Sequence, residues 1–134
     1  MSFAADIEQF AGDAIEHVEQ IRRVFIGKLC IVIIDRTPVL SGYLKGNWQP
    51  SIGTPEYDEV PRKSKEGGFV KQQVLDILAQ LKGDETFYFS NNAPYIIVIE
   101  YEGHSSTKAP EGMVRVSLTE VGMLVNQAIR EAKL

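Results

Sequence analysis

Three side chains near the end of an apolar run have residue types that bind divalent metals. Glu100, Glu102 and His104 alternate with other residues, so they would share one face if a strand continued through them. Two carboxylates and an imidazole can hold a divalent metal, and such a site would suit a small metal-dependent hydrolase or nuclease. The competing interpretation is a solvated strand end that runs into a polar loop. We favour that interpretation, because no matched nucleophile or base is found elsewhere in the sequence.

Common catalytic and cofactor-binding motifs are missing from the sequence. It has no glycine-rich phosphate loop, no Cys/His zinc spacing and no Gly-x-Ser-x-Gly turn. His17 lies beside Glu16 on a predicted helix, where a surface histidine is expected. Cys30, the only cysteine, lies in an apolar helical segment and is expected to be a small buried side chain. We therefore assign no catalytic, cofactor-binding or metal-binding residues, expect no cofactor, and predict that the protein is not an enzyme.

Length and composition indicate an ordered globular chain. Its 134 residues are 44% hydrophobic and 24% charged, which is typical of a single domain spanning residues 1–134. The net charge of −4 disfavours a general nucleic-acid binder, which normally presents a basic face. The longest aliphatic run, Leu29–Ile34, is far shorter than the ~20 residues of a membrane span. We expect no membrane partner, no specific nucleic acid, and synthesis in the cytoplasm without export.

Helical periodicity dominates the N-terminal quarter of the chain. Ser2 is a good N-cap, and apolar residues then recur every three or four positions until Pro38 ends the helix near Arg36. This helix is longer than a small domain needs, so its N-terminal half is expected to project or to pack on a neighbour. Two further helical stripes cover Val70–Leu81 and Val114–Ala128.

Two short strands complete the predicted elements. Lys45–Ile52 would place Trp48 and Pro50 on one face, and Thr86–Ser90 has the alternation of a second strand. Pro50 has no N–H, so its strand should be an edge, or Pro50 should point away from the ladder. The predicted fold class is α+β, with a long N-terminal helix and two further helices packed on a small, mainly antiparallel sheet.

Gly53–Gly68 is the one long irregular stretch. It contains two prolines, an acidic cluster and then a basic cluster. A loop of this length inside a compact domain is usually functional or mobile. We expect residues 53–68 to form a long mobile loop, either solvated or serving as a contact arm to a partner subunit. In the second case it would be poorly ordered in isolated subunits and ordered in the assembly.

Two segments carry a resemblance to a known family. The first is Arg36-Thr37-Pro38-Val39-Leu40-Ser41-Gly42, followed by Leu44, Gly46-Asn47-Trp48 and Ser51-Ile52-Gly53. The second is Asn91-Asn92-Ala93-Pro94-Tyr95, followed by Glu100-Tyr101, Gly103 and Ala109-Pro110-Glu111-Gly112-Met113-Val114. Together they resemble the neck and tail-completion proteins of long-tailed bacteriophages, which join the head to the tail.

The resemblance implies a structural virion protein. Such a neck, tail-completion or tail-terminator component forms a homo-oligomeric ring, a hexamer, between the head connector and the tail. Its partners are its own copies and the neighbouring head-connector and tail proteins. Its location is the virion, after assembly in the cytoplasm of the host bacterium.

Two other function classes stay open on the residues alone. One is the metal-dependent hydrolase or nuclease that would use Glu100, Glu102 and His104. The other is a regulatory binding module with a free long helix, which would stay monomeric until its partner arrives.

The two resembling segments also contain predicted turns, Thr37–Gly42 and Asn91–Tyr95. Their prolines and glycine set chain direction, so we expect them to lie near each other at one end of the sheet. Replacing Gly42 by Val should destabilise the fold by about 1–3 kcal/mol if the φ of Gly42 is positive. Arg36 is expected to cap the helix end or to reach a carboxylate. Trp48 and Tyr43 fit a core or an interface equally well.

Overall fold

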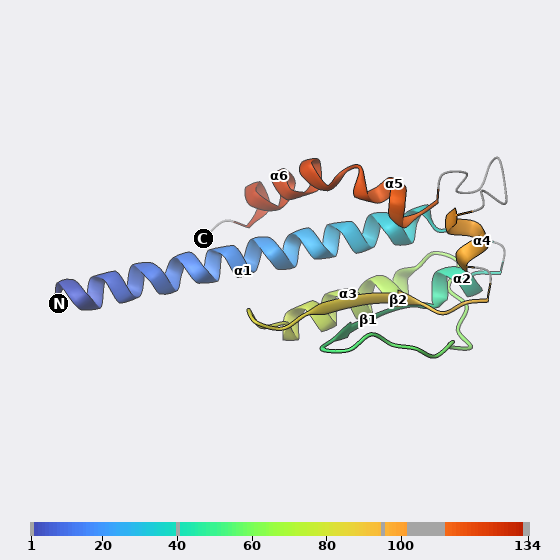
Figure 1. The fold of residues 1–134 in the computed structure, drawn as a ribbon, viewed down its shortest axis with the longest axis horizontal. Helices are drawn as coiled ribbons and strands as arrows, with labels where there is room; N and C mark the ends of the chain where they lie inside the picture. The colour runs from blue at the N-terminus through green and yellow to red at the C-terminus, as the bar shows by residue number, and fades with distance from the viewer. Residues whose placement is uncertain (1, 40, 95, 102–111, 133–134) are drawn as a thin grey trace.

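The structure is a computed structural model that describes residues 2–39, 41–94, 96–101 and 112–132. It confirms the α+β class, with a long N-terminal helix, several further helices and a two-stranded antiparallel sheet (Figure 1). The elements follow one another as α1 (Phe3–Arg36), α2 (Tyr43–Gly46), β1 (Trp48–Ile52), α3 (Gly68–Gln80), β2 (Phe87–Asn91), α4 (Ile96–Tyr101), α5 (Val114–Leu118) and α6 (Val121–Glu131).

Helix α1 has the ends that the sequence predicts. The Ser2 hydroxyl accepts a hydrogen bond from the N–H of Ala5 at 3.2 Å, and Thr37, just before Pro38, is already extended. Its 34 residues make it roughly 50 Å long at the usual rise. The N-terminal half runs past the rest of the molecule, whereas the C-terminal half lies between α6 and α3 (Figure 1).

The hydrophobic core gathers around the C-terminal half of α1. Ile34 of α1 and Val70 and Val74 of α3 are completely buried, as is Met113 just before α5. Helix α3 in turn packs against β1. Trp48 of β1 stacks on Phe89 of β2, with ring centroids 4.7 Å apart. The order of packing is therefore α6, α1, α3 and then the sheet.

Proline is accommodated in the sheet as expected. Strand β1 pairs with β2 in a register that sets Pro50 opposite Phe89. The N–H of Gly53 donates to the carbonyl of Thr86 at 2.9 Å, so Gly53 and Thr86 form a hydrogen-bonded pair. In an antiparallel ladder, hydrogen-bonded and non-hydrogen-bonded pairs alternate along the strand. Pro50, three residues before Gly53, therefore belongs to a non-hydrogen-bonded pair. Its missing N–H therefore faces away from β2, which confirms the prediction.

Two predicted boundaries are wrong. Residues Tyr43–Gly46 form the short helix α2, so the strand predicted from Lys45 begins only at Trp48. The single C-terminal helix is divided into α5 and α6. The hydroxyls of Ser117 and Thr119 donate to the carbonyls of Met113 and Val116, at 2.5 and 2.6 Å, and such local bonds favour a break between helices.

The segment between β1 and α3 folds back along the free edge of β1. Gln49 donates to the carbonyl of Asp58, Val60 donates to Asn47 Oδ1, and Ser64 donates to the carbonyl of Gly42, each at 2.8 Å. This alignment is antiparallel, but side chains make most of the bonds, so no third strand forms. The segment covers an edge that would otherwise expose unpaired backbone groups. Its bonds lie within one subunit, and its mobility in the isolated subunit stays a prediction.

The two predicted turns adjoin the same end of the sheet, because Thr37 Oγ1 accepts a hydrogen bond from the indole of Trp48 at the start of β1 and Asn91 is the last residue of β2. Trp48, which begins β1, is paired with Asn91, which ends β2. The Asn91 amide also donates to the carbonyl of Leu44, at 2.9 Å. Leu40 and Tyr95 lie outside the described residues. Gly42 has a φ of 87°, and a Cβ there would lie 2.7 Å from the backbone nitrogen of Lys65.

Two alanine variants separate backbone strain from steric contact. Gly53 also has a positive φ, of 89°, but a Cβ there meets nothing within 4 Å. We expect Gly53→Ala to lower the free energy of unfolding by about 1–2 kcal/mol, from strain alone. Gly42→Ala should lower it clearly more, because the backbone of Ser64 and Lys65 must also move. Urea denaturation measures both, and equal losses would contradict the close approach.

The buried thiol of Cys30 gives the stability a pH dependence. Burial raises the pKa of Cys30 to about 12. The unfolded thiol ionises near pH ~8.5, so above that pH the folded state keeps a proton that the unfolded state has lost, and stability falls. Between pH 8 and 10 the free energy of unfolding should fall by about 1–2 kcal/mol more in the unmodified chain than in Cys30→Ala. Parallel pH profiles for the two proteins would contradict the burial of the thiol.

Candidate functional site

Glu100 holds the start of α5. This residue is 5% exposed, and its carboxylate accepts hydrogen bonds from the N–H groups of Met113, Val114 and Arg115, at 2.5, 3.0 and 2.8 Å. The guanidinium of Arg115 also donates to the carbonyl oxygen of Glu100. These are the N–H groups that a helix start leaves without internal partners, so Glu100 acts as a cap supplied by α4.

A glycine is required beside this cap. Gly112 has a φ of 88°, and a Cβ there would lie 2.6 Å from the Glu100 carbonyl oxygen. The Glu-Tyr and Gly-Met-Val parts of the resembling segment are therefore two halves of one structural contact. They position the chain and leave little of Glu100 accessible to a ligand.

Both interpretations of Glu100, Glu102 and His104, a shared strand face and a solvated strand end, are wrong at Glu100, the one of the three that the structure describes. Residues 96–101 are helix α4, because Glu100 turns inward to meet α5. Glu102 and His104 lie outside the described residues. Within the described ranges, no three His, Cys, Asp or Glu side chains gather in a way that could hold a metal ion. The metal-dependent hydrolase alternative thus loses Glu100 as a metal ligand, because its carboxylate already accepts three backbone hydrogen bonds.

Other predicted candidates have structural positions. Arg36 donates to Ser117 Oγ at 3.1 Å and pairs with the Glu120 carboxylate, so it ties the end of α1 to the junction of α5 and α6. The Trp48 indole is buried and donates to Thr37 Oγ1 at 2.9 Å, which places it in the core. Tyr43 and His17 are half-buried, and Cys30 is buried as predicted.

Ser2–Val18, the N-cap and the first part of α1, form the most exposed apolar feature of the described chain, and we term this segment the arm. The body of the subunit begins just after the arm, where Arg22 donates to the carbonyls of Lys82, Gly83 and Glu85. Before that point, large apolar side chains lie in solvent with these exposed fractions: Phe3 79%, Ile7 51%, Phe10 76%, Ile15 61% and Val18 64%.

The arm is strongly amphipathic. At 100° per residue all of its apolar side chains except Ala5 fall in one arc of roughly 140°, and its charged side chains lie outside that arc. The apolar arc consists of Phe3, Ala4, Ile7, Phe10, Ala11, Ala14, Ile15 and Val18. An apolar stripe of this width normally faces a core. Here the described part of its own subunit does not cover it.

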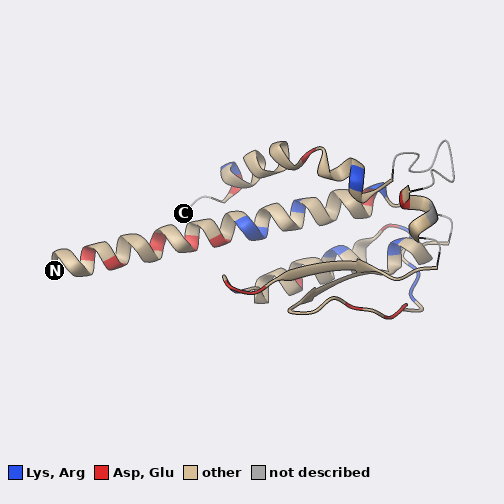
Figure 2. Cartoon of the chain, in the orientation of Figure 1, with Lys and Arg blue, Asp and Glu red and all other residues tan. Residues whose placement is uncertain are grey.

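Charge on the arm has one sign. Residues 2–21 contain five Asp or Glu residues and no Lys or Arg. Figure 2 shows these acidic positions along the projecting half of α1, with the first basic positions only where the helix reaches the body. The arm therefore offers an apolar face flanked by negative charge.

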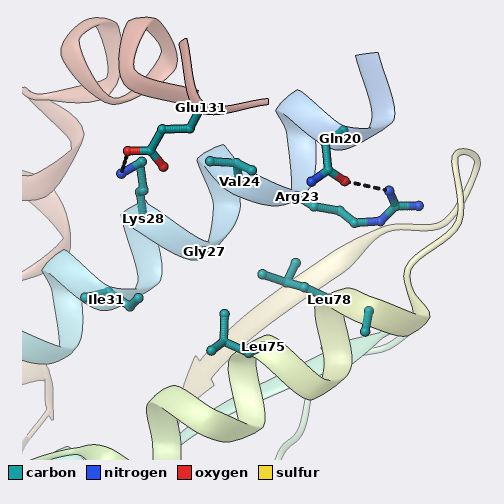
Figure 3. Close-up of a pocket in the computed structure, with 10 residues that line it drawn as sticks. Gln20, Arg23, Val24, Gly27, Lys28, Ile31, Leu75, Leu78 and Glu131 are labelled. Atoms are coloured by element: carbon teal, nitrogen blue, oxygen red, sulfur yellow. Dashed lines mark hydrogen bonds and ion pairs between the residues drawn. The ribbon is translucent and has the colours of Figure 1, made fainter. Parts of the chain in front are cut away.

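A groove lies on the body between α3 and the end of α6, with α1 as its floor. We term it the α1–α3 groove. Its floor carries Val24, Gly27 and Ile31, and Leu75 and Leu78 of α3 point toward it (Figure 3). Leu75 is 49% exposed. The remaining lining residues are Gln20, Arg23, Lys28, Ala79 and Glu131, with Lys28 and Glu131 joined by an ion pair of 2.7 Å.

Comparison of the chain with protein-family models, with curated proteins and with solved structures found no match. Among the helices of the described residues, none has both the length and the apolar character needed to cross a membrane.

The arm could be seen in the sequence, but the groove and the Glu100 cap could not. The arm belongs to one continuous apolar stripe of helical spacing, and the helix that this stripe predicts is longer than a small domain needs. The groove combines residues from three distant elements, and no local pattern marks it. Glu100 stands between apolar residues on α4, and that position was the only available signal that it turns inward.

Replacing Glu100 should lower stability without a change in metal binding. Glu100→Gln substitutes an NH₂ donor for one acceptor oxygen, which leaves a backbone N–H at the start of α5 unsatisfied. We expect a loss of about 1–3 kcal/mol in the free energy of unfolding. Glu66→Gln, at an exposed carboxylate, is the matched control and should change little. Saturable Mn²⁺ binding in calorimetry that Glu100→Gln abolishes at unchanged stability would favour the metal-site alternative instead.

Proposed function

We propose that this chain is a structural virion protein of a tailed bacteriophage, a neck, tail-completion or tail-terminator component that forms a ring joining the head connector to the tail. The observation that carries the proposal is the exposed apolar face of the arm. A ring protein needs a surface that is complete only when a neighbour is present. The ring with six subunits and the head and tail partners come from the resemblance described above.

Energetics favour an assembled state. Burying a side chain such as Val, Ile or Phe contributes about 1.5–3 kcal/mol, and the arm leaves five of them in solvent. Monomeric proteins seldom leave a contiguous apolar patch of this kind exposed, and such patches mark interaction sites. The arm thus has a large favourable free energy available for association.

The residues behind the resemblance fit a structural role. Asn91, Trp48, Thr37 and Glu100 hold parts of their own subunit together through the bonds described above. Two of these four bonds are buried and two are partly buried, and all of them join residues of the same subunit. These residues therefore stabilise the fold of the subunit, and we look for its binding function on the exposed surfaces.

A membrane-surface role is a poorer match to the arm. Helices that lie on membranes usually carry Lys and Arg on the polar face, which attract anionic lipids. The arm carries only acidic charge before Arg22. Its apolar face therefore suits a protein partner.

Paired substitutions on the arm test the proposal in particles. Phe10→Glu puts a charge in the apolar arc, whereas Gln9→Glu puts the same side chain on the polar side, one residue away. Both positions are exposed, so both variants should keep the stability of the unmodified monomer. In the phage that carries this chain, electron microscopy should show unjoined heads and tails for Phe10→Glu and normal particles for Gln9→Glu. Labelled chain should appear at the neck or tail end.

Two outcomes would contradict the proposal. Normal particles with Phe10→Glu would remove the arm from assembly. Label absent from particles, together with a purified chain that stays monomeric until another protein binds it, would favour the regulatory binding module.

A further inference from the structure

We infer that the α1–α3 groove of one subunit receives the arm of a second copy, so that subunits join head to tail. The inference rests on the proposed function, because it names the two surfaces that make the ring contact. The argument follows from chain geometry, surface chemistry and charge.

The arm cannot reach its own groove. It is the direct continuation of α1, and α1 forms the floor of the groove. At about 1.5 Å per residue, the 17 residues of the arm extend ~25 Å away from the body (Figure 1). Only a break in α1 would let the arm fold back. An occupant of the groove with the chemistry of the arm must therefore come from another copy.

The groove presents the surface that an amphipathic helix needs. Val24 and Ile31 on the floor and Leu75 on the wall are apolar, and the half-exposed Leu75 has room to be covered. A helix laid between α3 and α6 would join α1, α3 and α6 in a four-helix cluster, with its apolar arc on the floor. Two phenylalanines that can each bury about 150–250 Å², with the three aliphatic side chains beside them, approach the ~800 Å² per partner of a stable interface.

Charge selects the groove over a second arm. Two arms packed on each other would bring acidic flanks together with no Lys or Arg between residues 2 and 21 to compensate. The lining of the groove carries two cations, Arg23 and Lys28, against one carboxylate, Glu131, so its net charge is positive although both cations also pair with carboxylates of their own chain. Acidic residues at the edges of an incoming arm would find cations there, whereas another arm offers none.

Head-to-tail joining follows from the use of two different surfaces. An isologous dimer would bury the same patch on both subunits, whereas an arm-to-groove contact leaves one free arm and one free groove at the ends of any open chain of subunits. Such a chain ends only by closing into a ring.

Two variants that each disable one surface test the contact by complementation. Phe10→Glu disables the arm and leaves the groove intact, and Leu75→Glu disables the groove and leaves the arm intact. Leu118→Glu is the matched control, since Leu118 on α5 is 51% exposed and does not line the groove. Circular dichroism and melting temperature should match the unmodified chain for all three, because each replaced side chain is about half exposed or more.

Native mass spectrometry and light scattering report the assembly. We expect the unmodified chain and Leu118→Glu to form closed assemblies, and Phe10→Glu and Leu75→Glu to be monomers of 15.0 kDa when each is alone. An equal mixture of the two should give a complex of two 15.0-kDa chains in a 1:1 ratio, because one functional arm then meets one functional groove. This pair cannot extend further.

Other outcomes would overturn the inference in distinguishable ways. If Leu75→Glu assembles like the unmodified chain while Phe10→Glu does not, the arm binds elsewhere, and the proposed function is untouched. If Leu118→Glu also blocks assembly, the loss is not specific to the groove and the assignment fails. If the unmodified chain stays a 15.0-kDa monomer at every concentration, both the inference and the ring are overturned.

Discussion

Packing of the C-terminal half of α1 between α6 and α3 is the constraint on which the rest of this structure depends. Ile34 is completely buried and belongs to the same core cluster as Val70 and Val74, and Arg36 at the helix end is tied to the α5–α6 junction. The sheet packs on α3 through β1. Because a helix is stiff, this packing also fixes the direction in which the arm leaves the subunit. The core and the proposed contact surface are therefore parts of one element.

Buried polar groups specify how the smaller elements are arranged around that helix. Asn47 is completely buried, and its amide accepts from Val60 and donates to the carbonyl of Tyr43, both at 2.8 Å. Glu100 serves three backbone N–H groups at the start of α5. Among the described side chains, no buried nitrogen or oxygen lacks a partner. A two-stranded sheet is marginal by itself, and these bonds to neighbouring segments supply what more strands would otherwise provide.

Local patterns predicted α1, α3 and the two strands but not α2 or α4, and contacts between distant residues decided the site. The bounds of α1 follow from Ser2 and Pro38, and the class of the fold follows from three helical stripes and two short strands. The break between α5 and α6 depends on hydroxyl groups that bond to carbonyls within one turn, which a search for apolar periodicity does not detect. Glu100 was expected at a solvated strand end because alternation in sequence resembles a strand, and only the position of Met113–Arg115 in space shows what its carboxylate binds.

One continuous helix, α1, packs in the core at its C-terminal end and carries the proposed contact surface at its N-terminal end. The packing that stabilises the subunit therefore also sets the geometry of the proposed assembly. Because a helix is stiff, a small change in how α1 packs on α3 would be carried along the helix to Phe3. Gly27 illustrates the closeness of that packing, since a Cβ there would lie 3.3 Å from Leu78 Cδ1. The same Leu78 lines the α1–α3 groove. The side chains that aim the arm of one subunit therefore also shape the surface that, in our proposal, receives the arm of the next. A ring built from this contact would have its curvature set by the packing of α1 on α3.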